Sequence, residues 1–183
     1  MMHKQAREIV DFWFSNQVKA LWFKPTSEFD AQLREKYATR MQAACAGELR
    51  DWADTAQGAL ALIILLDQLP RNVHRGEPAS FASDAQALAI AGQSLEAGFD
   101  TQVDAEQRPF FYLPFMHSEQ LADQERCVEL CEAMHSEEHA RYARLHRDLI
   151  ARFGRFPHRN RIVDRASSDA EIEYLASDGA FQG

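Results

Sequence analysis

The run ALALIILL, residues 59–66, restricts the fold more than any other feature, because it is apolar on every side of a helix. As a helix its eight residues rise only about 12 Å, whereas the hydrocarbon layer of a membrane is about 30 Å thick. The run therefore predicts a central helix over residues 58–69, buried among other helices. We expect Pro70 to stop this helix or to bend it sharply.

Helical periodicity governs the rest of the chain as well, and no run of alternating β-branched residues predicts a strand. Further helices are expected at residues 4–14, 27–46, 84–97, 104–112, 118–134, 138–153 and 168–175, with a short helical turn around Trp52. The sequence thus predicts an all-α protein of eight or nine helices, stacked as antiparallel hairpins. No 34-residue repeat is visible, so periodicity alone does not predict a repeat protein.

Several residues carry the signals of helix ends. Ser27 can cap one helix, and His117 or Ser118 can open another. Gly154 is expected to end the helix that reaches Phe153. Ser168 and Glu171 have the spacing of a capping box, which predicts the start of the last helix.

The length of 183 residues fits one domain, residues 1–183, whose core needs neither a disulfide nor a metal. Charged residues interrupt the first turns, so we expect no secretory signal and a cytoplasmic protein. The three cysteines, Cys45, Cys127 and Cys131, do not have the spacing of a disulfide framework, and reduced thiols are the simpler interpretation.

The charge distribution is uneven. The net charge is -8, which argues against a nucleic-acid partner, because binding phosphates needs a positive face. Residues 141–165, the basic block, nevertheless hold eight arginines against Asp148 and Asp164, a local charge of +6. Such a block either pairs internally or binds an anion. After Lys36 the chain contains arginine but no lysine, and arginine suits bidentate hydrogen bonding to carboxylate or phosphate. Genome composition could cause the same bias.

The segment HRDLIARFGRFPHRN, residues 146–160, mixes basic and aromatic residues around one glycine and one proline. Helical spacing places His146 in an apolar arc, so we expect a core histidine more than a catalytic base. His158 follows Pro157 in a predicted loop, where it has more freedom to meet a ligand. Gly154 and Pro157 should turn the chain back toward neighbouring helices.

Other polar residues have both a structural and a functional interpretation. Asp67 follows the apolar run, so it needs a cation, and Arg71 and Arg75 are the nearest in sequence. Ser118 and Glu119 suit a helix start, where a hydroxyl caps and a carboxylate meets the positive end of the dipole.

Two carboxylates of the next helix are expected to differ. Glu125 borders the buried stripe and needs a partner or a raised pKa. Asp123 falls on the opposite side of the helix, where we expect it to be solvated.

Motifs for metal or nucleotide chemistry are weak or absent. Cys127, Cys131, His135 and His139 recur every four residues, but successive members rise about 6 Å along a helix, so at most two could share a metal. The sequence contains no GxxxxGK, GxGxxG or GxSxG motif. We expect no cofactor and no metal site.

The strings DFWF, LALIILLDQLPRN, FFYLP, MHSEQLADQE and HRDLIARFGRFPHRN resemble the bacterial family called domain of unknown function 924, from Val10 to about Phe181. The resemblance implies a tetratricopeptide-like, right-handed array of antiparallel helices, and it implies no established activity, substrate or cofactor. The chain departs from the family pattern at Ser15, at Leu69 and at residues 163–168. The polar positions that match the family pattern are Asp67, Gln68, Arg71, Asn72, Arg75, His117, Ser118, Glu119, Gln124, Arg155, His158, Arg159 and Asn160.

Two functional hypotheses follow. In the first, an anionic small molecule with a carboxylate or phosphate group binds in a pocket, and His117 and His158 transfer protons if the protein is an enzyme. Four arginines would hold the anion: Arg71, Arg75, Arg155 and Arg159. In the second, the helical array binds a protein or an acidic peptide and the polar cluster is purely structural. The sequence does not indicate an oligomeric state.

Overall fold

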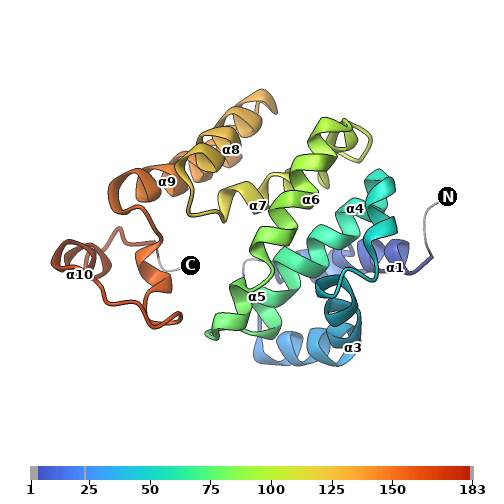
Figure 1. Cartoon of the computed structure of the whole chain (residues 1–183), viewed down its shortest axis with the longest axis horizontal. Coiled ribbons are helices and arrows are strands. Elements are labelled where there is room, and N and C mark those ends of the chain that lie inside the picture. Colours follow the sequence, from blue (N-terminus) through green and yellow to red (C-terminus); the bar gives the residue numbers. More distant parts are fainter. Residues whose placement is uncertain (1–3, 23, 182–183) are drawn as a thin grey trace. The chain divides into compact units, whose positions relative to one another are not determined.

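The apolar run lies inside one continuous helix. A computed structural model describes residues 4–22 and 24–181. In it α4 (Ala56–Ile63), the π-helical segment η2 (Ile64–Gln68) and α5 (Leu69–Val73) follow one another without a break (Figure 1). Every side chain from residue 59 to residue 66 is buried, which confirms this run as the centre of a core.

Pro70 does not stop this helix, so the first of the two expected outcomes is wrong, whereas a bend at Pro70 stays a prediction. Proline lacks the N–H that an α-helix uses to bond the carbonyl four residues earlier, here that of Leu66. The Ser83 hydroxyl donates to this carbonyl instead, at 2.6 Å. The Arg71 guanidinium donates to the next carbonyl, that of Asp67, at 2.7 Å. The Ser83 side chain therefore supplies the donor that Pro70 lacks.

Three longer helices surround the central one in the first of two compact units, which holds the described residues of 1–75 and 79–114. Both α1 (Lys4–Trp13) and α6 (Asp84–Glu96) contact α4, and α3 (Ser27–Cys45) contacts α5 (Figure 1). Shorter segments complete this part of the chain: α2 (Asn16–Lys19), η1 (Arg50–Asp54), η3 (Pro78–Phe81) and η4 (Phe99–Thr101).

The cap of α3 differs from the prediction. Thr26, not Ser27, has an extended backbone before the first turn, and its hydroxyl accepts a hydrogen bond from the Phe29 N–H at 3.2 Å. Ser27 is already inside the helix, so it cannot serve as the N-cap.

The helix predicted over residues 104–112 is also wrong. This stretch contains a short 3-10 helix, η5 (Arg108–Phe111), and the four-residue helix α7 (Leu113–Met116) follows it. Pro109 and Pro114 lack backbone donors, and proline disfavours helical backbone in the residue before it. Side-chain bonds hold the segment instead: the Tyr112 hydroxyl donates to Asp100 at 2.7 Å.

The second unit, formed by residues 76–78 and the described residues of 115–183, contains a helical hairpin. Its helices α8 (Leu121–Ala133) and α9 (Glu137–Phe153) lie side by side and run antiparallel (Figure 1). As predicted, α9 ends at Gly154, whose φ is 71°. The predicted start of α8 at His117 or Ser118 is wrong, because Gln120 is the N-cap.

Two short elements follow the hairpin, η6 (Pro157–Arg159) and α10 (Asp169–Leu175). The predicted capping box is confirmed: the Ser168 hydroxyl accepts from the Glu171 N–H, and the Glu171 carboxylate accepts from the Ser168 N–H. The core beneath these elements consists of Leu149, Ile150 and Phe156, with partly buried aromatic rings around them.

The predicted fold class is confirmed, because residues 4–22 and 24–181 form helices and turns and no strand. Nine α-helices occur in these residues when the continuous helix of α4 and α5 is counted once, which agrees with the predicted eight or nine. The single domain expected for residues 1–183 stays a prediction.

Candidate functional site

The polar residues predicted around Asp67 form an ion-pair network within the first unit. Asp67 is fully buried and lies 3.3 Å from Arg71, as expected for the nearest cation in sequence. Arg71 also makes two hydrogen bonds with the Asp84 carboxylate, at 2.9 and 3.0 Å. Gln68 donates to the second Asp67 oxygen at 2.6 Å. Burial alone would lower the pKa of Arg71, but the two carboxylates raise it, so the guanidinium stays charged.

Asn72 and Arg75 both donate to one carboxylate, that of Asp30 on α3. The Asn72 amide donates at 2.9 Å, and the Arg75 guanidinium donates at 2.9 and 3.2 Å. The sequence did not indicate Asp30 or Asp84 as partners, because neither lies near the motif along the chain. Arg71 and Arg75, two of the predicted anion receivers, therefore already hold protein carboxylates and join α5 to α3 and α6.

In the second unit Glu119 anchors the turn after Gly154. Its carboxylate accepts from the Phe156 N–H at 2.9 Å and from two nitrogens of Arg165 at 2.6 and 2.9 Å. Burial would raise the pKa of Glu119, but Arg165 and the Phe156 N–H lower it below its ordinary value. The helix-start role predicted for Glu119 is wrong, because its oxygens bond to the turn after α9 instead.

Arg155 holds the start of α10. Its guanidinium donates twice to the buried Glu171 carboxylate, both at 2.7 Å, and once to the Ala166 carbonyl at 2.8 Å. Hydrogen bonds from Arg155 lower the pKa of Glu171 to about 2. Arg155, a third predicted anion receiver, is thus paired with a carboxylate that also caps a helix.

The turn at His117 is held by the buried Arg159 and Gln124. The Arg159 guanidinium donates to the His117 carbonyl at 3.0 Å and lies over the Phe156 ring, 4.6 Å from its centroid. The Gln124 amide donates to the Met116 carbonyl at 2.7 Å. The structure therefore brings the His117 turn and the segment from Phe156 to Asn160 together.

Asn160 acts within the same loop. It is buried, and its amide donates to the Ser167 hydroxyl at 3.0 Å. This bond links the two ends of the loop that leads to α10.

His146 and His158 lie on either side of an aromatic cluster. His146 is buried, as predicted, and its Nδ1 donates to the Tyr142 carbonyl at 2.8 Å. The Phe181 ring contacts both imidazoles edge-on, with centroid distances of 4.6 Å to His146 and 5.2 Å to His158. Burial, assisted by Arg159, lowers the pKa of each histidine to about 4, so both are neutral at pH 7.

His158 is not in a free loop. It belongs to η6, and its Nδ1 is buried without a hydrogen-bond partner among the described residues. The freedom expected after Pro157 is absent because this 3-10 turn packs His158 against Phe156 and Phe181.

The burial predicted for the two carboxylates of α8 is the reverse of what the structure shows. Asp123 is partly buried and accepts from the Ser118 hydroxyl at 2.6 Å, although solvation was predicted. Glu125 is exposed, although it was predicted to border the core. Both errors come from taking the face of Leu121 as the buried one: Leu121 is 41% exposed, and Gln124, Cys127 and Cys131 form the buried face.

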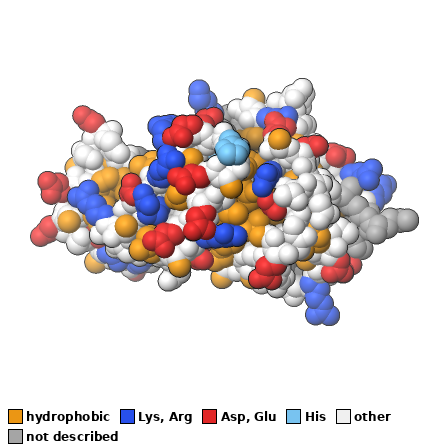
Figure 2. Space-filling view, turned by 90° about the horizontal axis from the view of Figure 1, so that it is seen from above, with side chains coloured by type: hydrophobic (Ala, Val, Ile, Leu, Met, Phe, Trp, Pro, Cys, Tyr) orange, Lys and Arg blue, Asp and Glu red, His pale blue; other side chains and the backbone are white. Residues whose placement is uncertain are grey.

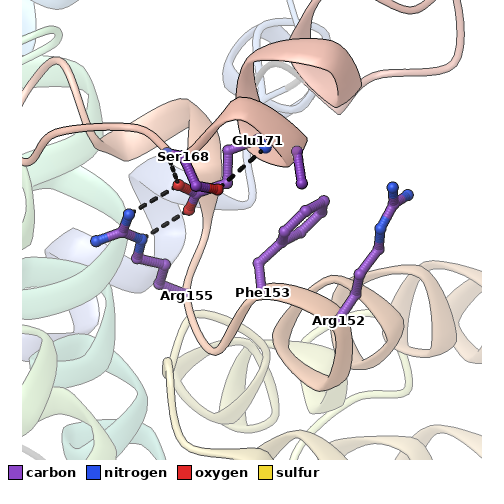
Figure 3. A pocket seen from close by; sticks show the side chains of 6 residues that line it. Arg152, Phe153, Arg155, Ser168 and Glu171 are labelled. Atoms are coloured by element: carbon purple, nitrogen blue, oxygen red, sulfur yellow. Dashed lines mark hydrogen bonds and ion pairs between the residues drawn. The ribbon is translucent and has the colours of Figure 1, made fainter.

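A pocket of about 430 Å³ lies where the end of α9 meets the start of α10 (Figure 3). Figure 3 shows the Arg155 side chain pointing to Glu171, whereas Arg152 extends away from Glu171 beside Phe153. The lining residues are Arg152, Phe153, Arg155, Ser168, Ala170 and Glu171. In the sequence, the signal for Arg152 is its place in the basic block, residues 141–165.

Metal-binding groups do not assemble in the part of the chain that the structure describes, where no three His, Cys, Asp or Glu side chains are placed to hold an ion.

The face of the molecule shown in Figure 2 carries acidic and basic side chains interspersed, with hydrophobic ones exposed between them. No described helix is long and apolar enough to cross a membrane.

These observations define an all-helical protein in which arginine and carboxylate pairs fix the helix ends. A family model described as bacterial proteins of unknown function, DUF924, matches residues 9–179, and the chain belongs to this family. The chain is also similar to a solved structure of a protein of unknown function from Agrobacterium tumefaciens. The two share 38% sequence identity with a TM-score of 0.90, over 94% of this chain and 97% of that chain. No curated protein matches.

Proposed function

We propose that the protein binds a small anionic molecule, with a carboxylate or phosphate group, in the pocket between α9 and α10. Arg152 is the observation that carries this proposal. Its guanidinium lies over the rings of Phe153 and Tyr174, 4.6 and 5.9 Å from their centroids. Within residues 4–22 and 24–181 no carboxylate pairs with Arg152, which therefore keeps its charge available to a ligand.

Among the arginines of the basic block without a carboxylate partner in the described residues, Arg152 is the one that lines the pocket. In the basic block, four arginines have carboxylate partners: Arg144, Arg147, Arg155 and Arg165. The hypothesis from the sequence assigned the anion to four arginines: Arg71, Arg75, Arg155 and Arg159. Because the first three already pair with protein carboxylates, we assign the anion to Arg152 instead. A guanidinium supported by two aromatic rings is oriented before the ligand arrives, so less side-chain entropy is lost on binding.

Arg152→Gln tests this proposal. Inorganic phosphate, pyrophosphate and a panel of mono- and dicarboxylates are screened for thermal stabilisation, and the best probe is titrated by calorimetry. The Arg152→Gln variant should lose most of the binding, because the ligand's charge then has no cation to pair with. Arg161→Gln is the matched control, since Arg161 is exposed in the same basic block and outside the pocket. Equal binding by the two variants, or no binding by the wild type, contradicts the proposal.

Proton transfer by His117 and His158 stays a separate prediction, because neither histidine lines this pocket. Because burial keeps the His158 imidazole neutral at pH 7, it could accept a proton as a base, but it is not the charged imidazolium that serves as a general acid. A reaction of the bound anion that is lost in His158→Gln, with binding retained, would support catalysis. Unchanged turnover would exclude His158.

The second function, an interaction module, rests on apolar side chains that the α8/α9 hairpin exposes. Tyr142 and Leu145 lie one turn apart on α9 and are 42% and 38% exposed, and Leu121 on α8 is 41% exposed. Large exposed apolar side chains on one helical face are typical of helix-mediated recognition. In a pull-down from bacterial extract, a stoichiometric partner that Leu145→Asp removes would favour this function, and a clean bait would argue against it.

A further inference from the structure

Two of the three cysteines lie together on the buried face of α8. Cys127 and Cys131 are one helical turn apart, 0% and 1% exposed, with their Sγ atoms 4.0 Å from each other. The third cysteine, Cys45, is exposed and lies at the end of α3 in the other unit. The two thiols of α8 therefore form a pair of soft donor atoms separate from the pocket proposed above.

The distance between the two sulfurs indicates which chemistry the pair suits. A disulfide needs sulfurs about 2.05 Å apart, so Cys127 and Cys131 would have to approach by about 2 Å. An ion bound to both thiolates at about 2.3 Å spans 4.0 Å when the angle at the ion is about 120°. The spacing thus suits a trigonal ion as it stands, and a pyramidal ion once the two side chains draw the sulfurs slightly closer.

We propose that Cys127 and Cys131 form a two-thiolate site for one soft, low-coordinate metal or metalloid ion, of the class of copper(I) or trivalent arsenic. Zinc fits poorly, because it takes four ligands and no group of three suitable side chains occurs among the described residues. Thiolates select soft ions, and two or three ligands satisfy such ions.

The surroundings of the pair support this site. Helix α9 packs along α8. In the first half of α9 the buried residues are the small Ala140 and Ala143. Since both sulfurs are buried, the site admits an ion more readily than a bulky thiol reagent.

Arsenite is the probe for the experiment, because a stable adduct needs two thiols rather than one. In the reaction As(OH)₃ gains two As–S bonds and loses two As–O bonds, and the thiol protons leave in two water molecules without any oxidation. Native mass spectrometry of the folded, reduced protein should show one arsenic per chain. The Cys45→Ser variant should bind equally, whereas Cys127→Ser and Cys131→Ser should each lose the adduct.

A second measurement keeps the proposal falsifiable if a serine variant unfolds. In folded Cys45→Ser protein, arsenite should raise the midpoint of thermal unfolding, because it binds the thiol pair of the folded state. The proposal is overturned if arsenite binds only after denaturant is added, if Cys131→Ser retains the adduct, or if arsenite leaves the thermal midpoint unchanged. Cys127→Ala and Cys131→Ala, which avoid a buried hydroxyl, replace any serine variant that does not fold.

Discussion

At the scale of single residues, Arg71 is the side chain on which the polar network of the first unit depends. Arg71→Gln leaves the fully buried Asp67 without its cation, and we expect it to lower the free energy of unfolding by about 3 kcal/mol. Arg75→Gln is the matched control: Arg75 is 52% exposed, and its loss should cost less than about 1 kcal/mol. Urea unfolding of both variants measures the difference. Equal losses would mean that the buried carboxylate does not need Arg71.

His146 and His158 predict a pH dependence of stability. Their pKa values fall from 6.5 to about 4 on folding, so the unfolded chain binds more protons between these values. The stability they provide is complete above pH 6.5 and is lost as the pH falls toward 4. For each histidine the loss between pH 7 and pH 5 is about 2 kcal/mol. Urea midpoints should fall over this range, and by less in His146→Gln. An identical slope in the variant would contradict the buried, neutral state of His146.

At the scale of elements, the helix through Pro70 depends on a side-chain donor from α6's N-terminal flank. Ser83→Ala leaves the Leu66 carbonyl buried with no donor from Pro70, so we expect a loss of about 1–3 kcal/mol in urea unfolding. Ser94→Ala is a closely matched control. Ser94 is as buried as Ser83, but its hydroxyl bonds to the Ile90 carbonyl, which the helix backbone already satisfies, so the loss should be below about 1 kcal/mol. The same loss in both variants would show that Pro70 creates no special requirement.

The elements also show what a sequence can predict. Where one local signal dominates, the prediction held: the apolar run 59–66, Gly154 and the Ser168 capping box are all confirmed. The prediction that Pro70 stops the helix failed, because the donor that rescues the helix, Ser83, lies on another element. The partners of the candidate site were missed for the same reason. Glu119 pairs with Arg165, 46 residues away, and no local periodicity encodes such a contact.

At the scale of the whole molecule, chain connectivity argues that both units unfold together. The chain passes to the second unit at Gly76, returns to the first at Ala79 and leaves it again at Phe115, so the second unit is not contiguous. It holds only about 70 residues, a size at which one hydrophobic core rarely supplies more than about 3–5 kcal/mol. We therefore propose that residues 1–183 behave as one cooperative domain.

The positions of the tryptophans make this cooperativity measurable. Trp13, Trp22 and Trp52 all lie in the first unit, so fluorescence reports on that unit, whereas far-ultraviolet circular dichroism reports on the helices of both. In urea the two signals should give one midpoint. Glu171→Gln, which weakens the Arg155 pair in the second unit, should then lower the fluorescence midpoint as much as the dichroism midpoint. If fluorescence stays unchanged while dichroism shifts, the two units unfold independently and the single-domain proposal is wrong.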